Sequence, residues 1–229
     1  ASKVDAELES NVVLSALYGL RRSYYRLDEY QKAIADFDEA QRREPSFRPG
    51  YIRGLCRYYS GDFHKAIDDF TLAIEDETAL DDPSDLDDAH AHRANCWAKL
   101  GNNENAIADY DAAIELGYED VKAYVNRGIA KEETGKLNEA IADYNEAITI
   151  DAACVTAYHF RAALRDDLGQ YEQAIEDYTT AITLTPDDAT LYNNRGSSWH
   201  DLDEFDQAID DYTQAIDLHP NYAIAYNNR

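Results

Sequence analysis

The chain has 229 residues, of which 45% are hydrophobic, 29% are charged and 11% are aromatic, and its formal net charge is −25. This composition is that of a folded chain, since disordered chains are poor in aromatic residues. The negative charge disfavours nucleic-acid phosphates, and no apolar run reaches the roughly 18 residues of a membrane span, so we expect neither nucleic-acid binding nor membrane insertion. The first residues lack the basic and apolar regions of a signal peptide, which favours a soluble, cytoplasmic protein without fixing its location.

Apolar residues recur with helical spacing from residue 14 to the end of the chain. The pattern predicts antiparallel helix pairs with short turns, and residues 1–13 either prolong the first helix or fray. The expected pairs are 14–27 with 31–43, 47–60 with 64–77, 87–100 with 104–116, 121–134 with 138–150, 155–168 with 172–184, and 189–202 with 206–218.

One phrase, Ala-Ile-x-Asp followed by Phe or Tyr, occurs six times. Its alanines are Ala33, Ala66, Ala106, Ala140, Ala174 and Ala208, which are 33, 40, 34, 34 and 34 residues apart. The phrase places apolar side chains on one helix face that a single helical hairpin cannot bury. We therefore expect successive hairpins to stack and share a continuous core.

A period of 34 residues is that of the tetratricopeptide repeat, which the chain resembles over residues 14–229. In the fifth copy, the family's small, aromatic, small and proline positions fall on Ala174, Tyr178, Ala181 and Pro186. The resemblance implies an all-α fold, a right-handed superhelical solenoid of antiparallel helix pairs with six repeats and an incomplete seventh. The repeats are about 14–46, 47–80, 87–120, 121–154, 155–188, 189–222 and, in part, 223–229.

Two irregularities interrupt the period. The 40-residue step adds six residues around 78–88, a stretch rich in Asp that lacks the Gly of a calcium loop, so we expect a solvated acidic loop. Residues 223–229 begin a seventh copy, which suggests a fragment of a longer protein. The helix before it should then keep an apolar face, with Ile209, Tyr212 and Ile216 only partly shielded, and this face should favour self-association.

Motifs of enzymes and metal sites are missing from the sequence. It has no His-Glu-x-x-His, no phosphate-binding Gly-rich loop, no Gly-x-Ser-x-Gly and no Cys-x-x-Cys. His90 and His92 stand two residues apart on a helix, where they point to different faces. Of the three cysteines, Cys56 and Cys96 fall at a small core position of the repeat. We therefore expect no enzyme, no cofactor and no metal.

An acidic and a basic residue recur once in each copy. The aspartates are Asp36, Asp69, Asp109, Asp143, Asp177 and Asp211, each one residue before the ring. The arginines are Arg53, Arg93, Arg127, Arg161, Arg195 and Arg229, whereas the first copy has Leu20 at this position. Because a first repeat has no predecessor, we expect each Asp to meet the Arg of the next repeat, which would make a ladder of ion pairs between repeats.

The resemblance also implies that the first helices of the pairs line a concave groove. Eleven side chains at the implied groove positions are candidates for partner binding: Arg22, Tyr25, Arg26, Arg48, Tyr51, Tyr58, Tyr59, His92, Asn95, Lys99 and Asn126. Residues 21–59 hold nine basic against six acidic residues, whereas residues 60–229 hold 11 against 37. The groove should therefore have a basic, Tyr-rich beginning and an acidic far end.

These features predict a protein-interaction scaffold that binds a peptide or protein segment in its groove. Tyr and Arg often anchor interfaces, and Arg suits carboxylates, so the N-terminal half should prefer an acidic or carboxylate-bearing partner. The alternative for these side chains is that the tyrosines pack between helices and the arginines are surface charges. The alternative for the whole chain is a self-assembling module that forms homo-oligomers through its terminal helices.

Overall fold

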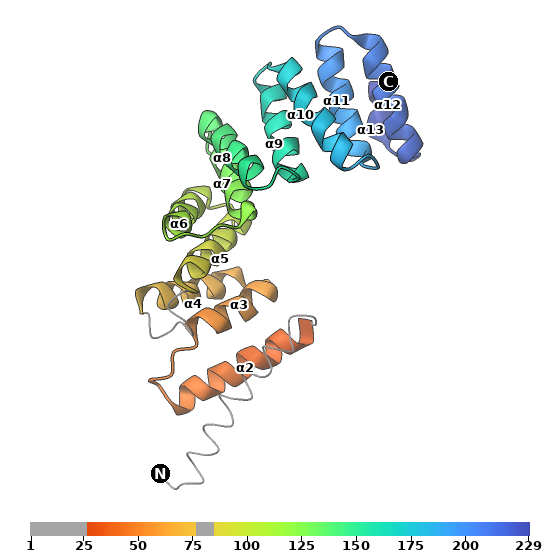
Figure 1. Ribbon diagram of the computed structural model, residues 1–229. Helices are drawn as coiled ribbons and strands as arrows, with labels where there is room; N and C mark the ends of the chain where they lie inside the picture. The colour runs from red at the N-terminus through yellow and green to blue at the C-terminus, as the bar shows by residue number, and fades with distance from the viewer. Residues whose placement is uncertain (1–26, 77–84) are drawn as a thin grey trace. The chain divides into compact units, whose positions relative to one another are not determined.

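The computed structural model describes residues 27–76 and 85–229, all of whose regular structure is helical (Figure 1). By their contacts the residues form two compact units, unit 1 (1–119) and unit 2 (120–229). The described helices of unit 1 are α2 (Leu27–Arg43), α3 (Gly50–Tyr59), α4 (Phe63–Glu75), α5 (Leu86–Lys99) and α6 (Asn103–Glu115). Those of unit 2 are α7 (Val121–Glu133), α8 (Leu137–Ile150), α9 (Val155–Asp167), α10 (Tyr171–Leu184), α11 (Ala189–Asp201), α12 (Phe205–Leu218) and α13 (Ala223–Asn228).

The helices follow the predicted pairs to within a few residues. The predicted first helix, residues 1–13 and most of the predicted acidic loop lie outside the described residues. In the described ranges, no helix has the length and apolar character that crossing a membrane requires. A single solenoid over residues 14–229 stays a prediction.

The core of each unit runs from one helical hairpin into the next. In unit 1, Phe70 of α4 packs in one cluster with Leu55 of α3 and Cys96 of α5. In unit 2, Tyr144 of α8 packs with Leu164 of α9, which belongs to the following pair. Cys56 and Cys96 are completely buried, which confirms that they are small core residues. Neighbouring hairpins therefore share a core, as the repeat pattern predicts.

Small residues in the first helix let the ring of the second helix approach it closely. A Cβ added to Gly128 would lie 2.6 Å from Cε1 of Tyr144, and one added to Gly196 would lie 2.8 Å from Cε1 of Tyr212. Both contacts are shorter than van der Waals packing allows, so glycine is required while the rings stay in place.

The Arg–Asp ladder joins the two helices of one repeat, and the prediction that it joins consecutive repeats was wrong. The shortest N–O distances are 2.6–2.7 Å in the pairs Arg53–Asp69, Arg93–Asp109, Arg127–Asp143, Arg161–Asp177 and Arg195–Asp211. In each pair the Arg uses Nε and Nη2 as a fork on the two carboxylate oxygens. The geometry is that of a bidentate, charge-assisted pair.

The remaining guanidinium nitrogen, Nη1, makes the contact to the preceding repeat. Nη1 of Arg195 donates to the hydroxyl of Thr179 over 3.0 Å, and Nη1 of Arg93 donates to the hydroxyl of Thr71 over 2.9 Å. Nη1 of Arg53 donates to Asp38 over 2.9 Å. The acceptor is in each case the residue after the ring of the preceding copy, so one Arg side chain links three helices.

Further side chains of the first helices also contact the aspartates of the ladder. Arg165, four residues after Arg161, lies 2.6 Å from the second oxygen of Asp177. In the third copy, Nδ1 of His90 lies 3.0 Å from Asp109. Burial by itself raises the pKa of the Asp109 carboxyl, but hydrogen bonds from His90 and Arg93 outweigh it and hold this pKa below its ordinary value.

The prediction for the helix before the seventh copy was wrong for two of its three residues. Tyr212 and Ile216 are buried, because Tyr212 packs against Gly196 and Ala225 of α13 lies in one cluster with Ile216. Ile209 is 45% exposed. Ile141, the equivalent of Ile209 in the fourth copy, packs with Leu164 of the following repeat. The helix α13 ends at Asn228, before the position that corresponds to Leu164, so α13 does not cover Ile209 in this way.

Candidate functional site

Ten of the eleven candidate residues belong to unit 1. Arg22, Tyr25 and Arg26 fall outside the described residues. The other candidates of this unit are carried by α3, by the turn before it and by α5. Among these, Tyr58, Tyr59 and His92 have neighbouring rings, and the ring of Tyr51 lies 6.4 Å from that of His92.

This group, the aromatic cluster, consists of Tyr58, Tyr59 and His92. The ring of Tyr58 lies 5.2 Å from that of Tyr59 and 5.7 Å from that of His92, both edge to face. Tyr59 is 42% exposed and Tyr58 is half-buried. Rings in such pairs stabilise one another, and an exposed tyrosine offers a rigid apolar face together with a hydroxyl group. The cluster can therefore contact a partner with little loss of side-chain entropy.

A hydrogen bond fixes the histidine of the aromatic cluster. Nδ1 of His92 lies 2.8 Å from the carbonyl oxygen of Asp88. A carbonyl oxygen only accepts, so Nδ1 carries the hydrogen, and the neutral ring keeps Nε2 as an acceptor. The hydrogen bond therefore orients the His92 ring, which lies edge to face with that of Tyr58.

The other candidates of unit 1 have mixed surroundings. Tyr51 is buried in the core, and Arg48 donates from Nη1 to the carbonyl of Pro45. Asn95 accepts a hydrogen bond of 2.6 Å from the hydroxyl of Tyr110, whereas Lys99 is exposed at the end of α5. Tyr51 thus contributes to packing, whereas the exposed Lys99 is accessible to a partner.

Asn126 belongs to unit 2 and lines a pocket of about 410 Å³. The pocket, which we call the α7–α9 pocket, is bounded by the amino-terminal ends of these helices and by the turn before α9. Its lining residues are Asp120, Val121, Lys122, Val125, Asn126, Asp151, Cys154 and Thr156. Of these residues only Asn126 is among the predicted binding candidates, because a pocket depends on how neighbouring side chains fill space and the repeat pattern does not show this.

A row of carboxylates lies along the ends of the first helices of unit 2. The carboxylate row consists of Glu132, Glu133, Asp166, Asp167 and Asp201. Burial, together with the charges of Asp167 and Glu133, raises the pKa of Glu132, although the hydroxyl of Tyr144 donates to it over 3.0 Å. Burial and the charges of Asp201 and Asp167 likewise raise the pKa of Asp166. The carboxylates of the row repel one another, and those of Glu132 and Asp166 are in addition partly desolvated.

Glu132→Gln should stabilise unit 2 at neutral pH by a few tenths to about 1 kcal/mol. The folded chain raises the pKa of Glu132 above its ordinary value, so the ionised form is a cost at neutral pH that disappears as the pH falls through the raised pKa. Urea unfolding at several pH values should show the gain shrinking towards zero in acid. Glu146→Gln, at an exposed position of α8, is the control and should change little. A loss of stability at neutral pH would show that the carboxylate is needed for structure.

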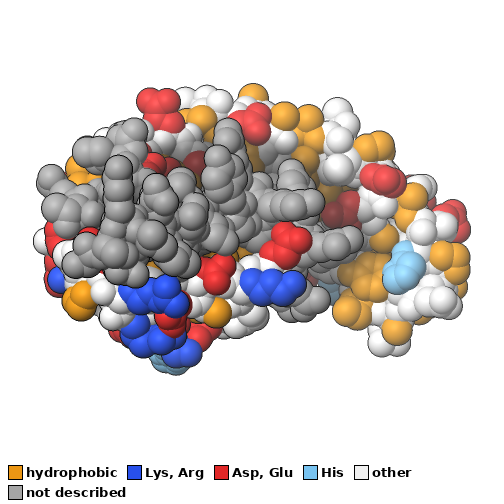
Figure 2. Space-filling view, turned by 90° about the horizontal axis from the view of Figure 1, so that it is seen from below, with side chains coloured by type: hydrophobic (Ala, Val, Ile, Leu, Met, Phe, Trp, Pro, Cys, Tyr) orange, Lys and Arg blue, Asp and Glu red, His pale blue; other side chains and the backbone are white. Residues whose placement is uncertain are grey.

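Charge is unevenly distributed. Unit 2 has 21 acidic and eight basic residues, and five of the eight, Arg127, Lys131, Arg161, Arg165 and Arg195, pair with aspartates of the ladder. On the face shown in Figure 2, acidic side chains are spread widely, whereas Lys and Arg are seen mainly at its lower left and lower middle. The described part of the chain brings no three potential metal ligands together.

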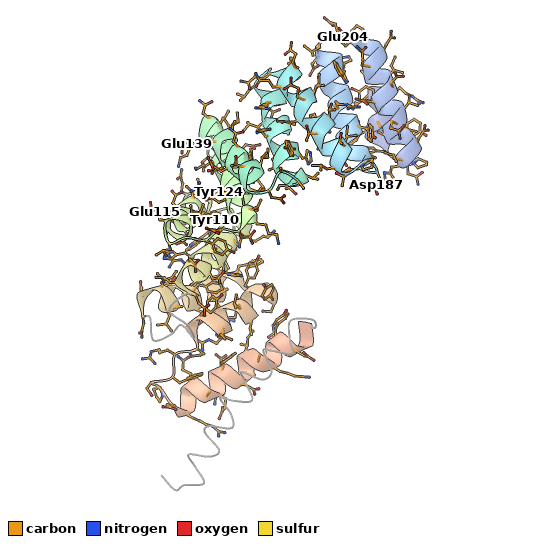
Figure 3. All side chains as sticks on the ribbon, viewed as in Figure 1. Tyr110, Glu115, Tyr124, Glu139, Asp187 and Glu204 are labelled. Atoms are coloured by element: carbon orange, nitrogen blue, oxygen red, sulfur yellow. The ribbon has the colours of Figure 1, made fainter. Side chains whose placement is uncertain are left out.

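Cation–π contacts hold the arginines of the later copies. Cζ of Arg127 lies 5.5 Å from the ring centroid of Tyr124, which is labelled in Figure 3, and Arg161 and Tyr158 repeat this geometry at 5.5 Å. The early tyrosine of each of these copies is therefore engaged with the ladder, which makes it a poor candidate for partner binding.

Models of one family match most of the chain. Models described as tetratricopeptide repeat match residues 51–117, 98–153 and 189–222, and a TPR repeat model matches residues 167–203. Sperm-associated antigen 1A of Danio rerio is 33% identical over 82 residues, which are 35% of this chain and 19% of that protein. The chain thus spans about a fifth of the length of this curated relative.

Solved structures show the same fold at low identity. The crystal structure of YrrB, described as a TPR protein with an unusual peptide-binding site, has a TM-score of 0.69 at 16% identity and covers 83% of this chain and 96% of its own. MamA from Desulfovibrio magneticus RS-1 has a TM-score of 0.66 at 17% identity and covers 74% and 92%. The arrangement of helices is therefore shared, although the overall sequence identity is only 16–17%.

Proposed function

Because the chain belongs to the tetratricopeptide repeat family, we propose that it is a protein-interaction scaffold that binds a segment of another protein along its first helices. The family assignment supports the interaction role, and the similarity to YrrB supports a peptide as the form of the ligand. Catalysis has no motif to support it in the sequence.

The partner segment should be acidic where it meets unit 1. The observation that carries this is the charge split: residues 21–59 are the net-positive stretch of a chain with a net charge of −25. The aromatic cluster and the exposed Lys99 lie in the same unit. Aromatic side chains next to cations are typical of interface anchors, and a local positive field speeds the association of an acidic segment. We expect Arg22, Tyr25 and Arg26 to complete this surface.

Arg22→Glu combined with Arg26→Glu should raise the Kd for an acidic peptide by more than about tenfold, because two attractive charges become repulsive. Peptides would be selected from a random library on the immobilised chain, and their Kd measured by fluorescence anisotropy. The helical signal and Tm should stay nearly unaltered.

The control for this experiment is Arg42→Glu with Arg43→Glu. It makes the same charge change in the last turn of α2, where both side chains are exposed and pair only with Glu39 among the described residues. Equal weakening by both double variants would mean that net charge alone governs binding. Selected peptides without acidic residues would contradict the proposed preference.

Self-assembly remains the alternative function. Phe205, Ile209, Ile224 and Tyr226 of α12 and α13 are about half exposed, and apolar side chains in such a group favour contacts with other chains. Sedimentation over a range of concentrations distinguishes the two functions, since only self-assembly makes the mass depend on concentration.

A further inference from the structure

The α7–α9 pocket has a partly apolar lining, and its volume is large enough for a branched aliphatic side chain together with an adjoining charged group. Val121, Val125 and Cys154 supply this lining, and Val125 belongs to the buried core. The volume of about 410 Å³ falls in the range in which proteins bind small molecules or the anchoring side chain of a peptide. Burial of a leucine-sized group there removes apolar surface from water.

The rim of the pocket is acidic. Asp120 accepts the N–H of Lys122 over 2.9 Å as the amino-terminal cap of α7, and Asp151 accepts the N–H of Ala153 over 2.9 Å. Each bond uses Oδ1, so Oδ2 of each exposed side chain does not take part in it. One cation, Lys122, stands against these two carboxylates in a unit that is itself strongly acidic. The field at the pocket therefore favours a positive group.

We propose that the α7–α9 pocket binds an aliphatic side chain that a partner segment carries next to a cationic group, such as leucine beside lysine, arginine or a free amino terminus. The aliphatic group fills the apolar lining, and the cation lies between Asp120 and Asp151. This inference rests on the proposed scaffold function only in that the side chain belongs to a partner. It places a basic, apolar anchor on unit 2, in contrast to the acidic segment expected on unit 1.

Cys154 supplies a reporter inside the pocket. It is the only half-buried cysteine, whereas burial raises the pKa of Cys56 and of Cys96 to about 12. Alkylation requires the thiolate, so near neutral pH iodoacetamide should modify Cys154 first. Mass spectrometry measures the rate, and Cys154→Ser gives the background from the other two thiols.

Three small probes separate shape from charge. Leucinamide carries the side chain and, at about pH 7, a mostly protonated amino group. N-acetylleucine has the same side chain with a negative charge, and glycinamide has the positive charge without the side chain. Leucinamide should slow alkylation of Cys154 about threefold at about twice its Kd, because only the unoccupied fraction reacts. The other two probes should have little effect at the same concentration.

The variant that tests the rim is Asp120→Asn with Asp151→Asn. Asparagine keeps an oxygen for the backbone N–H and is as good a helix cap as aspartate, so the fold should persist while both charges are lost. Leucinamide should no longer protect Cys154 in this variant. A control is Asp188→Asn, which makes the same substitution once, at the cap of α11, where Oδ1 accepts the N–H of Thr190 over 2.8 Å, outside the pocket. It should leave the protection intact.

Protection is expressed as a ratio of rates within each variant, since loss of a nearby charge also changes the reactivity of the thiol itself. Equal protection by all three probes, or none by any, would overturn the proposal. So would protection by leucinamide that survives in the Asp120→Asn, Asp151→Asn variant. Each of these outcomes leaves the peptide experiment on Arg22 and Arg26 unaffected, so failure of the pocket and failure of the acidic-partner proposal are distinguishable.

Discussion

Gly128→Leu should destabilise unit 2 by about 3 kcal/mol. A Cβ at this position would lie 2.6 Å from Cε1 and 3.0 Å from Cδ1 of Tyr144, a ring with no exposed surface. The ring cannot swing away freely, because its hydroxyl donates to Glu132. Removal of a helical glycine would by itself add up to about 1 kcal/mol of stability, so the clash must outweigh this gain.

Urea unfolding followed by the fluorescence of Trp199, in a Trp97→Phe background, reports on unit 2. The control is Ala142→Leu, which adds bulk at an exposed position of the adjacent helix and should change stability by no more than about 0.5 kcal/mol. If Gly128→Leu is as stable as its parent, the close approach of α7 and α8 does not hold in solution.

Asp177→Ala should cost about 3–5 kcal/mol, the loss expected when one partner of a buried ion pair is removed. Asp177 is 4% exposed and accepts from Nε and Nη2 of Arg161 at 2.9 and 2.6 Å and from Nη1 of Arg165 at 2.6 Å. Its removal leaves two largely desolvated guanidinium groups unpaired. The same urea measurement tests this loss.

The first copy supplies a matched control. Asp36 holds the same place in the phrase, but Leu20 stands where the other copies have Arg, and Asp36 makes no ion pair with the described residues. Asp36→Ala should therefore cost less than about 1 kcal/mol. Combining Asp177→Leu with Arg161→Met and Arg165→Met should recover most of the loss, because no unpaired charge remains. A triple variant as unstable as Asp177→Ala would mean that shape, and not charge, governs this site.

The repeat phrase predicted the helix pairs and the shared core, because side-chain periodicity alone determines which face of a helix is buried. Periodicity did not predict which arginine pairs with each aspartate of the ladder. Asp143 is 16 residues from Arg127 and 18 from Arg161, so spacing in the sequence hardly separates the two partners. The orientation of the arginine towards the second helix of its own repeat decides between them, and that orientation depends on packing. A signal for the inter-repeat contact was present, since a polar residue follows the ring in each copy, as in Asn145 and Thr179.

The candidate site was predictable in part. Helical spacing placed Tyr51, Tyr58 and Tyr59 on one helix, but the degree of exposure that separates core from surface depends on the neighbouring helices. Tyr51 is buried whereas Tyr59 is exposed, although both occupy expected groove positions. The pocket beside Asn126 needs the sizes of eight side chains from three segments, which no single helix pattern contains.

The six additional residues between the second and third copies show which part of the chain sets the joint between repeats. Nη1 of Arg93 reaches the hydroxyl of Thr71 over 2.9 Å across 22 residues, whereas Arg195 reaches Thr179 across 16. The two helix faces therefore define the joint, because the same contact forms although six more residues separate its two partners. We therefore expect the chain to tolerate an inserted epitope or fluorescent label between the second and third copies, where the sequence already carries six additional residues.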